Sequence, residues 1–145
     1  MIKIENSVEI NKPIEQVFEF VTNIDNLPLW AGPVTEAKQT SEGPVGVGTT
    51  QTQVAQLLGR KVETYQEVTE YELNKKFTTK STSGPIPMEI QYTFEPNAGG
   101  TRVELVGMVD AGGFFKLAEP FVARTLKRQT EGDVKTLKEL LETSA

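Results

Sequence analysis

Residues 86–109 constrain the fold most strongly, because two runs of alternating apolar and polar residues flank one short turn there. The first run places on one face Ile86, Met88, Ile90, Tyr92 and Phe94. The second run does the same with Val103, Leu105, Gly107 and Val109, and the sequence PNAGG separates the two. This period of two predicts an antiparallel hairpin with one buried face and one face toward water.

Strand and turn patterns continue through the whole of residues 34–111. We expect six strands in this region, within VTEAKQTS, GVGTTQTQVAQLL, RKVETYQEVTEY, NKKFTTKSTS, IPMEIQYTFE and TRVELVGMVDA. A further strand is expected at the N-terminus, where the apolar positions alternate with polar ones: Ile2, Ile4, Val8 and Ile10, with Asn6 in the same row. Together these runs predict an antiparallel sheet of seven strands.

Two short helices are expected between the first and second strands. In NKPIEQVFEFV the apolar residues recur at spacings of three and four, with Asn11 as a candidate N-cap and Pro13 in the first turn. A second helix is expected over residues 24–29, where Pro28 limits the length to about one turn.

A long helix is expected over residues 114 to about 143. Its apolar positions are Leu117, Phe121, Leu126, Val134, Leu137, Leu140 and Leu141. Pro120 either kinks this helix or marks where a looser lead-in becomes regular. Helices that segregate to one side of an antiparallel sheet define an α+β architecture. We therefore expect a single α+β domain over residues 1–145.

The composition excludes several kinds of chemistry. The chain has no cysteine and no histidine, which excludes disulfides, thiolate or imidazole metal sites, a cysteine nucleophile and a Ser-His-Asp triad. A net charge of -5 disfavours nucleic-acid binding, and the one basic cluster, Arg124, Lys127 and Arg128, is interpreted as a solvated helix face.

The sequence also bears on location. No apolar run is long enough to cross a membrane, so no integral membrane association is expected. The first residues, MIKIENSVEI, alternate and lack the pattern of a secretory signal, so we expect a cytoplasmic protein.

Polar residues interrupt the apolar stripe of the long helix at its middle. They are Gln129, Thr130, Gly132 and Asp133. One interpretation is a cavity wall, because buried polar groups without partners cost about 1 to 3 kcal/mol each and a ligand or water would satisfy them. The other is a helix rotated so that Gln129 and Asp133 meet solvent. Gly132 is expected to allow a close approach of helix and sheet.

Two of the expected strands are rich in small polar residues. In FTTKSTS, Phe77, Thr79 and Ser81 share one face, and TTQTQVAQ places threonine or glutamine on either face. Beside Met88 and Tyr92 this composition predicts a pocket of mixed polarity. Edge strands or strands facing water explain the same composition.

The only tryptophan, Trp30, closes the segment NIDNLPLW. An indole combines a large apolar area with one hydrogen-bond donor, which suits either the end of a ligand cavity or a core position.

This chain resembles the START-like helix-grip superfamily, also called SRPBCC, and within it the polyketide cyclase/dehydrase-type or lipid-binding branch. The matching segments are VEINKPIEQVFEFVTNIDNLPLW, GVGT, YTFEPNAGGTRVEL and LKELLE. The resemblance implies a seven-stranded antiparallel sheet curved around the long C-terminal helix, with an elongated apolar cavity between them. It also implies that the two short helices support one end of that cavity, near Trp30.

We therefore expect a domain that binds a small hydrophobic molecule such as a lipid, a polyketide-like aromatic or an isoprenoid. The candidate cavity residues are Trp30, Phe77, Met88, Tyr92, Phe114 and Phe121, with Arg124 and Gln129 as polar anchors. No catalytic residue, cofactor or metal is predicted, and the protein is expected to be a monomer or a homodimer.

Two other functions stay open at this point. A cyclase/dehydrase-type enzyme would fold a flexible substrate and move protons with a tyrosine or a carboxylate. A protein-interaction or stress-response module would expose an apolar patch on the outer face of the sheet, and the alternation there argues against such a patch.

Overall fold

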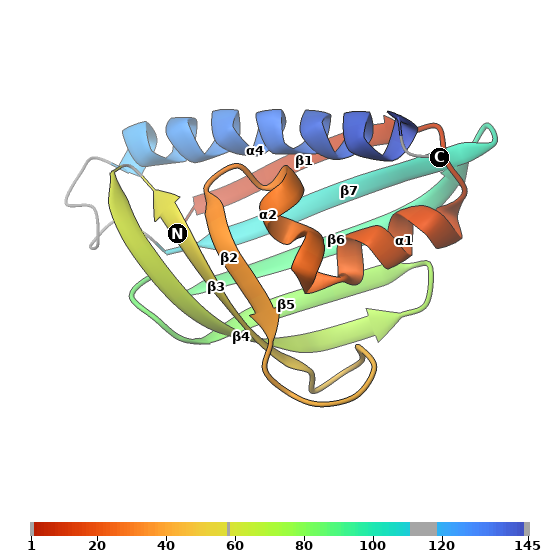
Figure 1. The fold of residues 1–145 in the computed structure, drawn as a ribbon. Coiled ribbons are helices and arrows are strands. Elements are labelled where there is room, and N and C mark those ends of the chain that lie inside the picture. The colour runs from red at the N-terminus through yellow and green to blue at the C-terminus, as the bar shows by residue number, and fades with distance from the viewer. Residues whose placement is uncertain (1, 58, 111–118, 144–145) are drawn as a thin grey trace.

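The computed structural model describes residues 2–57, 59–110 and 119–143. The strands are β1 (Ile2–Ile10), β2 (Val34–Gln39), β3 (Thr50–Leu57), β4 (Arg60–Glu72), β5 (Lys76–Ser83), β6 (Met88–Asn97) and β7 (Gly100–Val109). In the described part of the chain they form one antiparallel sheet in the order β1-β7-β6-β5-β4-β3-β2. Figure 1 shows this sheet curving beneath the long helix α4 (Glu119–Thr143). This is the helix-grip fold, as predicted.

The β6–β7 hairpin follows its predicted alternation. Met88 pairs with Val109 and Phe94 with Val103, so the apolar rows of the two strands lie on the same face. Ala98 and Gly99 form the turn, and both have positive φ angles, 48° and 84°. A two-residue turn of this type matches the right-handed twist of the strands that it joins.

Three short helical segments lie between β1 and β2: α1 (Ile14–Thr22), the 3-10 helix η1 (Ile24–Asn26) and α2 (Leu27–Trp30). The expected cap of α1 is wrong, because Pro13 occupies the N-cap position. The backbone N–H of Asn11 instead donates to Glu142 Oε2 on α4 at 2.8 Å. Asn11 therefore ties the end of β1 to the long helix.

Helix α4 begins at Glu119, so Pro120 lies in its first turn and does not kink it. The side chains that it buries are Val122, Leu126, Val134, Leu137 and Leu141. The expected stripe was partly wrong, because Phe121 and Leu140 are exposed and Leu117 lies outside the described residues. Val122 occupies the buried position next to Phe121, one residue and about 100° further round the helix.

The buried apolar side chains of the described residues form two clusters on the concave side of the sheet. The larger surrounds Phe18, whose ring meets those of Tyr71 and Phe94 edge to face at 5.4 and 5.0 Å. The smaller one includes Val62, Ile86 and Val122. Residues of both clusters border the space described next.

Candidate ligand-binding cavity

A cavity of about 170 Å³ lies between the sheet and α4. All seven strands contribute to its wall, together with α1, η1, α2 and α4. An apolar cavity of about 150 Å³ is large enough to hold benzene. The space therefore suits a molecule built on one or two rings.

Aliphatic side chains form the wall on the β1–β7–β6 side: Ile4, Ile90, Leu105, Val109 and, from α4, Leu126. Gly107 of β7 lies among them, and a Cβ atom added to it would meet no other atom within 4 Å. The absence of a side chain at Gly107 thus leaves open space in front of the strand.

Among the described residues, three aromatic side chains border the cavity, and all three are buried. The Trp30 ring meets Tyr92 edge to face at 6.3 Å, and Phe77 stacks on Tyr92 at 6.0 Å. Trp30 is 3% exposed and belongs to the core cluster while also lining the cavity. Trp30 thus occupies a core position and also borders the cavity.

A polar group lies where the loop after α2 meets α4. Asp133 Oδ1 accepts hydrogen bonds from the backbone N–H of Gly32 at 3.0 Å and from Gln129 Nε2 at 3.1 Å. Burial raises the pKa of the Asp133 carboxyl, and these two hydrogen bonds oppose that rise. Gln129 is exposed yet also lines the cavity, so this polar group lies at the edge of the cavity.

Tyr92 lies within electrostatic reach of this carboxyl. Burial raises the pKa of the Tyr92 hydroxyl far above its usual range, and the charge of Asp133 adds to the effect. Tyr92 is therefore neutral at physiological pH and can act as a hydrogen-bond donor.

A second polar group faces the cavity from β3 and β4. Gln51 and Gln66 pair across the two strands, and Gln51 Nε2 donates to Gln66 Oε1 at 3.0 Å. Both are almost fully buried, and Gln66 Nε2 lies 3.8 Å from Met88 Sδ. The polar strand residues thus face a pocket of mixed polarity. Thr79 faces it too, whereas Ser81 Oγ accepts from the backbone N–H of Met88 and does not line it.

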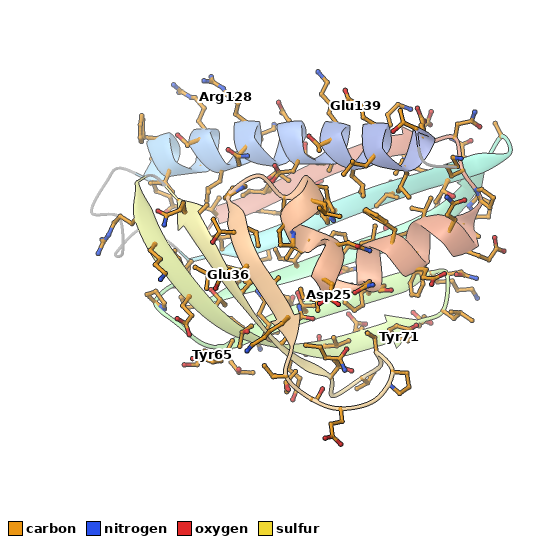
Figure 2. The ribbon with its side chains drawn as sticks, in the orientation of Figure 1. Asp25, Glu36, Tyr65, Tyr71, Arg128 and Glu139 are labelled. Atoms are coloured by element: carbon orange, nitrogen blue, oxygen red, sulfur yellow. The ribbon has the colours of Figure 1, made fainter. Side chains whose placement is uncertain are left out.

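The structure places five of the predicted site residues on the cavity wall: Trp30, Phe77, Met88, Tyr92 and Gln129. Phe121 and Arg124 do not line it, and their expected placement is corrected. Both lie on the outer side of α4, where Phe121 is 52% exposed. Figure 2 shows their neighbour Arg128 pointing away from the sheet. Phe114 lies outside the described residues.

Arg124 faces outward because of the helical period. Leu126, two residues further along, points into the core, and two residues rotate a helix by about 200°. Gly132 also faces solvent, with open space around its Cα, so it does not bring helix and sheet together.

The site residues that the sequence did not single out are the pair Gln51 and Gln66, and Gly107. Asp133 was named in the interrupted stripe of the long helix, with a cavity wall and a solvent-facing position both open, and its side chain lines the cavity. Gly107 was present in the inward row of the hairpin, but nothing in the row indicated empty space. The orientation of the Asp133 carboxylate depends on its hydrogen bond with the backbone N–H of Gly32, which lies 101 residues away in the sequence.

Residues 2–57, 59–110 and 119–143 contain no cluster of three or more histidine, cysteine, aspartate or glutamate side chains suited to a metal. None of the helices in these ranges is both long and apolar enough to cross a membrane.

Comparison with known proteins identifies the family and supports the fold. The family model for polyketide cyclase/dehydrase and lipid transport matches residues 1–142. A crystal structure of a protein from Thermus thermophilus is similar, with 22% identity, a TM-score of 0.81, and coverage of 98% of this chain and 99% of that one. A START superfamily protein from Mycobacterium smegmatis is similar with 16% identity, a TM-score of 0.78 and 97% coverage of both chains. No curated protein matches the sequence.

Proposed function

The chain belongs to the polyketide cyclase/dehydrase and lipid transport family, and from this membership we propose that it binds a small, largely apolar molecule between the sheet and α4. The observation that carries the proposal is the unfilled space in front of Gly107, enclosed by aliphatic and aromatic side chains. Burial of apolar surface there would supply affinity at roughly 25 cal/mol per Å², less the cost of ordering the ligand.

The volume narrows the choice of ligand. Pockets for drug-sized molecules usually measure about 300 to 1,000 Å³, and this cavity is about 170 Å³. A compound of one or two rings is therefore favoured over a long acyl chain. The stacked Phe77 and Tyr92 rings, with Trp30 at the edge of Tyr92, favour an aromatic occupant.

One observation favours a second candidate function, a polyketide cyclase/dehydrase-type enzyme. A partly buried carboxyl with a raised pKa, beside a buried tyrosine, is typical of sites that transfer protons. In that case Asp133 would move a proton on a bound substrate. Chemical conversion of a bound compound that Asp133→Asn abolishes, while binding persists, would distinguish the enzyme from a carrier.

Trp30 provides the test of binding, because it is the only tryptophan and lines the cavity. We expect saturable changes in its emission on titration with naphthalene and smaller or absent changes with palmitate. Calorimetry with the same compounds checks that the signal reports binding. No saturable response to any neutral aromatic compound by either method would contradict the proposal.

Two phenylalanines provide matched variants for this titration. Phe77→Leu removes a ring from the cavity wall and should weaken naphthalene binding by about tenfold. Phe121→Leu makes the same change on the exposed side of α4 and should leave binding unchanged. Equal effects of the two substitutions would place the binding site elsewhere.

A further inference from the structure

The charge of the cavity wall is unbalanced. Among the described residues that line the cavity, Asp133 is the only one with an ionisable side chain other than Tyr92, and no lysine or arginine lies among them. A buried carboxylate on a ligand would therefore find no cation in this part of the wall. It would instead lie near the partly buried Asp133 carboxylate, and like charges repel more strongly there than in bulk water.

The Asp133 carboxylate also has one oxygen available to a ligand. Both of its hydrogen bonds, from Gly32 and from Gln129, end on Oδ1. No donor from the described part of the chain is bonded to Oδ2. These two bonds fix the orientation of the carboxylate without using its full capacity, which is about four acceptor sites.

A second group at the same end of the cavity has no partner. Trp30 Nε1 is buried, and no acceptor among the described residues reaches it. Trp30 is the last residue of α2, and Gly32, two residues later, donates to Asp133 on α4. The side chains of Trp30 and Asp133 both line the cavity. A buried donor without an acceptor costs about 1 to 3 kcal/mol, which a ligand oxygen at this place would recover.

We propose that this end of the cavity binds the polar group of a neutral or cationic aromatic ligand, a hydroxyl or an amine that donates to Asp133, and that the cavity rejects carboxylates. This inference rests on the proposed function and specifies its ligand class. A hydroxyl fits both groups, because its hydrogen can be donated to Asp133 while its oxygen accepts from Trp30. Fatty acids and aromatic acids are accordingly disfavoured.

Three compounds of nearly equal size test the inference: naphthalene, 2-naphthol and 2-naphthoate. Their affinities would be measured by calorimetry at about pH 8, well above the ordinary pKa of an aspartate. We expect 2-naphthol to bind at least about tenfold more tightly than naphthalene, because a hydrogen bond to a charged group contributes about that much to affinity. We expect 2-naphthoate to bind at least about tenfold more weakly than naphthalene.

The matched variant is Asp133→Asn, which removes the charge but keeps an oxygen for the Gly32 N–H. In this variant the preference for 2-naphthol over naphthalene should fall to about threefold or less, and 2-naphthoate should gain affinity relative to naphthalene. The ranking in the unaltered protein requires no variant, so it tests the inference even if Asp133→Asn folds poorly.

The outcomes separate this inference from the proposed function. If naphthalene binds and 2-naphthol binds no more tightly, or if Asp133→Asn leaves the ranking unchanged, the role of Asp133 is overturned and the cavity proposal stands. If none of the three compounds binds, both proposals fail.

Discussion

The two halves of the concave sheet surface are built from different side chains. On β6 and β7, inward positions carry residues such as Ile90, Leu105 and Val109, which need no hydrogen-bond partner. On β3 and β4, inward positions carry Gln51 and Gln66, which are as deeply buried as the aliphatic residues. Burying an amide is tolerated only when it is hydrogen-bonded, and the two glutamines meet that need by pairing with each other.

This difference indicates separate roles for the two halves. The β6–β7 half provides apolar area and, at Gly107, the space that a ligand would fill. The β3–β4 half buries two amide groups inside the protein. This requires that the hydrogen bond between Gln51 and Gln66 stays formed. A protein that needed only a stable core could carry leucines at both positions with little loss of stability, so we expect the polar half, together with the Asp133 end of the cavity, to serve recognition.

The largest expected effect comes from filling the apolar half. Gly107→Leu introduces a side chain into open space on the cavity wall. If the leucine displaces about 100 Å² of ligand contact, naphthalene affinity should fall by roughly 50- to 100-fold. The free energy of unfolding should rise by about 1 kcal/mol, because glycine weakens a strand. Calorimetry and urea denaturation measure the two quantities.

The control for this change lies one residue away. Met108 occupies the opposite face of β7 and does not line the cavity, so Met108→Leu should leave naphthalene binding unchanged. Retention of full affinity by Gly107→Leu, with the fold intact, would show that ligand does not occupy the space beside β7.

The contrast between the halves also explains which features the sequence predicted. In β6 and β7 the alternation of apolar and polar residues was regular enough to predict which side chains face inward. The observed pairing of Phe94 with Val103 keeps those side chains on one face. In β3, threonines and glutamines occupy both faces, so the pattern could not show that Gln51 points inward. Gln51 is buried there with Gln66 opposite it in register on β4, and pairing of this kind is a tertiary property.

Helix α4 shows the same limit. Its middle contains polar residues on the cavity side, so the apolar stripe there is too sparse to fix the rotation of the helix. Phe121 was consequently assigned inward although Val122 is the buried residue. The position of Asp133 depends on a contact with Gly32, between segments that only the folded chain brings together.

The next largest effect concerns the glutamine pair. Gln51→Leu or Gln66→Leu alone leaves the other buried amide without its partner and should lower the free energy of unfolding by about 1 to 3 kcal/mol. The double variant should recover most of that loss, since neither amide remains. Urea denaturation of the four proteins in a double-mutant cycle gives the coupling between the two side chains.

Gln53 serves as the control on the same strand. It also lines the cavity but is only half-buried, and its side chain makes no hydrogen bond with another described residue. Gln53→Leu should therefore change stability by less than about 0.5 kcal/mol. Additive losses for Gln51→Leu and Gln66→Leu would mean that the pair is not formed in solution.

A smaller effect on the free energy of unfolding is expected from the charge of Asp133. The folded protein raises the pKa of Asp133 above its ordinary value of 3.8, so folding favours the protonated form. This contribution to stability is present below the ordinary pKa and is lost as the pH rises through the raised one. Compared with Asp133→Asn, the unaltered protein should therefore lose free energy of unfolding as the pH rises from about 4 toward neutrality.

Denaturation at a series of pH values measures this difference. At Glu142 we expect the opposite pH dependence of the free energy of unfolding, because Lys138 and the Asn11 N–H lower the pKa of its carboxyl. Glu142→Gln should cost stability at neutral pH, where the carboxylate is charged, and the cost should fade as the pH drops below the ordinary value of 4.5. A pH-independent difference between the unaltered protein and Asp133→Asn would contradict the burial of that carboxyl.

The smallest effect is expected at Gly132, which was expected to allow a close approach of helix and sheet. Gly132 lies within α4, faces solvent and has open space around it. Gly132→Ala should raise the free energy of unfolding by about 0.5 to 1 kcal/mol, because alanine favours the helix, and should leave naphthalene affinity unchanged. A loss of stability would mean that the helix lies closer to its neighbours than the structure shows. A loss of affinity without a loss of stability would mean that the cavity extends past Gln129 to the outer side of α4, where Phe121 and Arg124 lie.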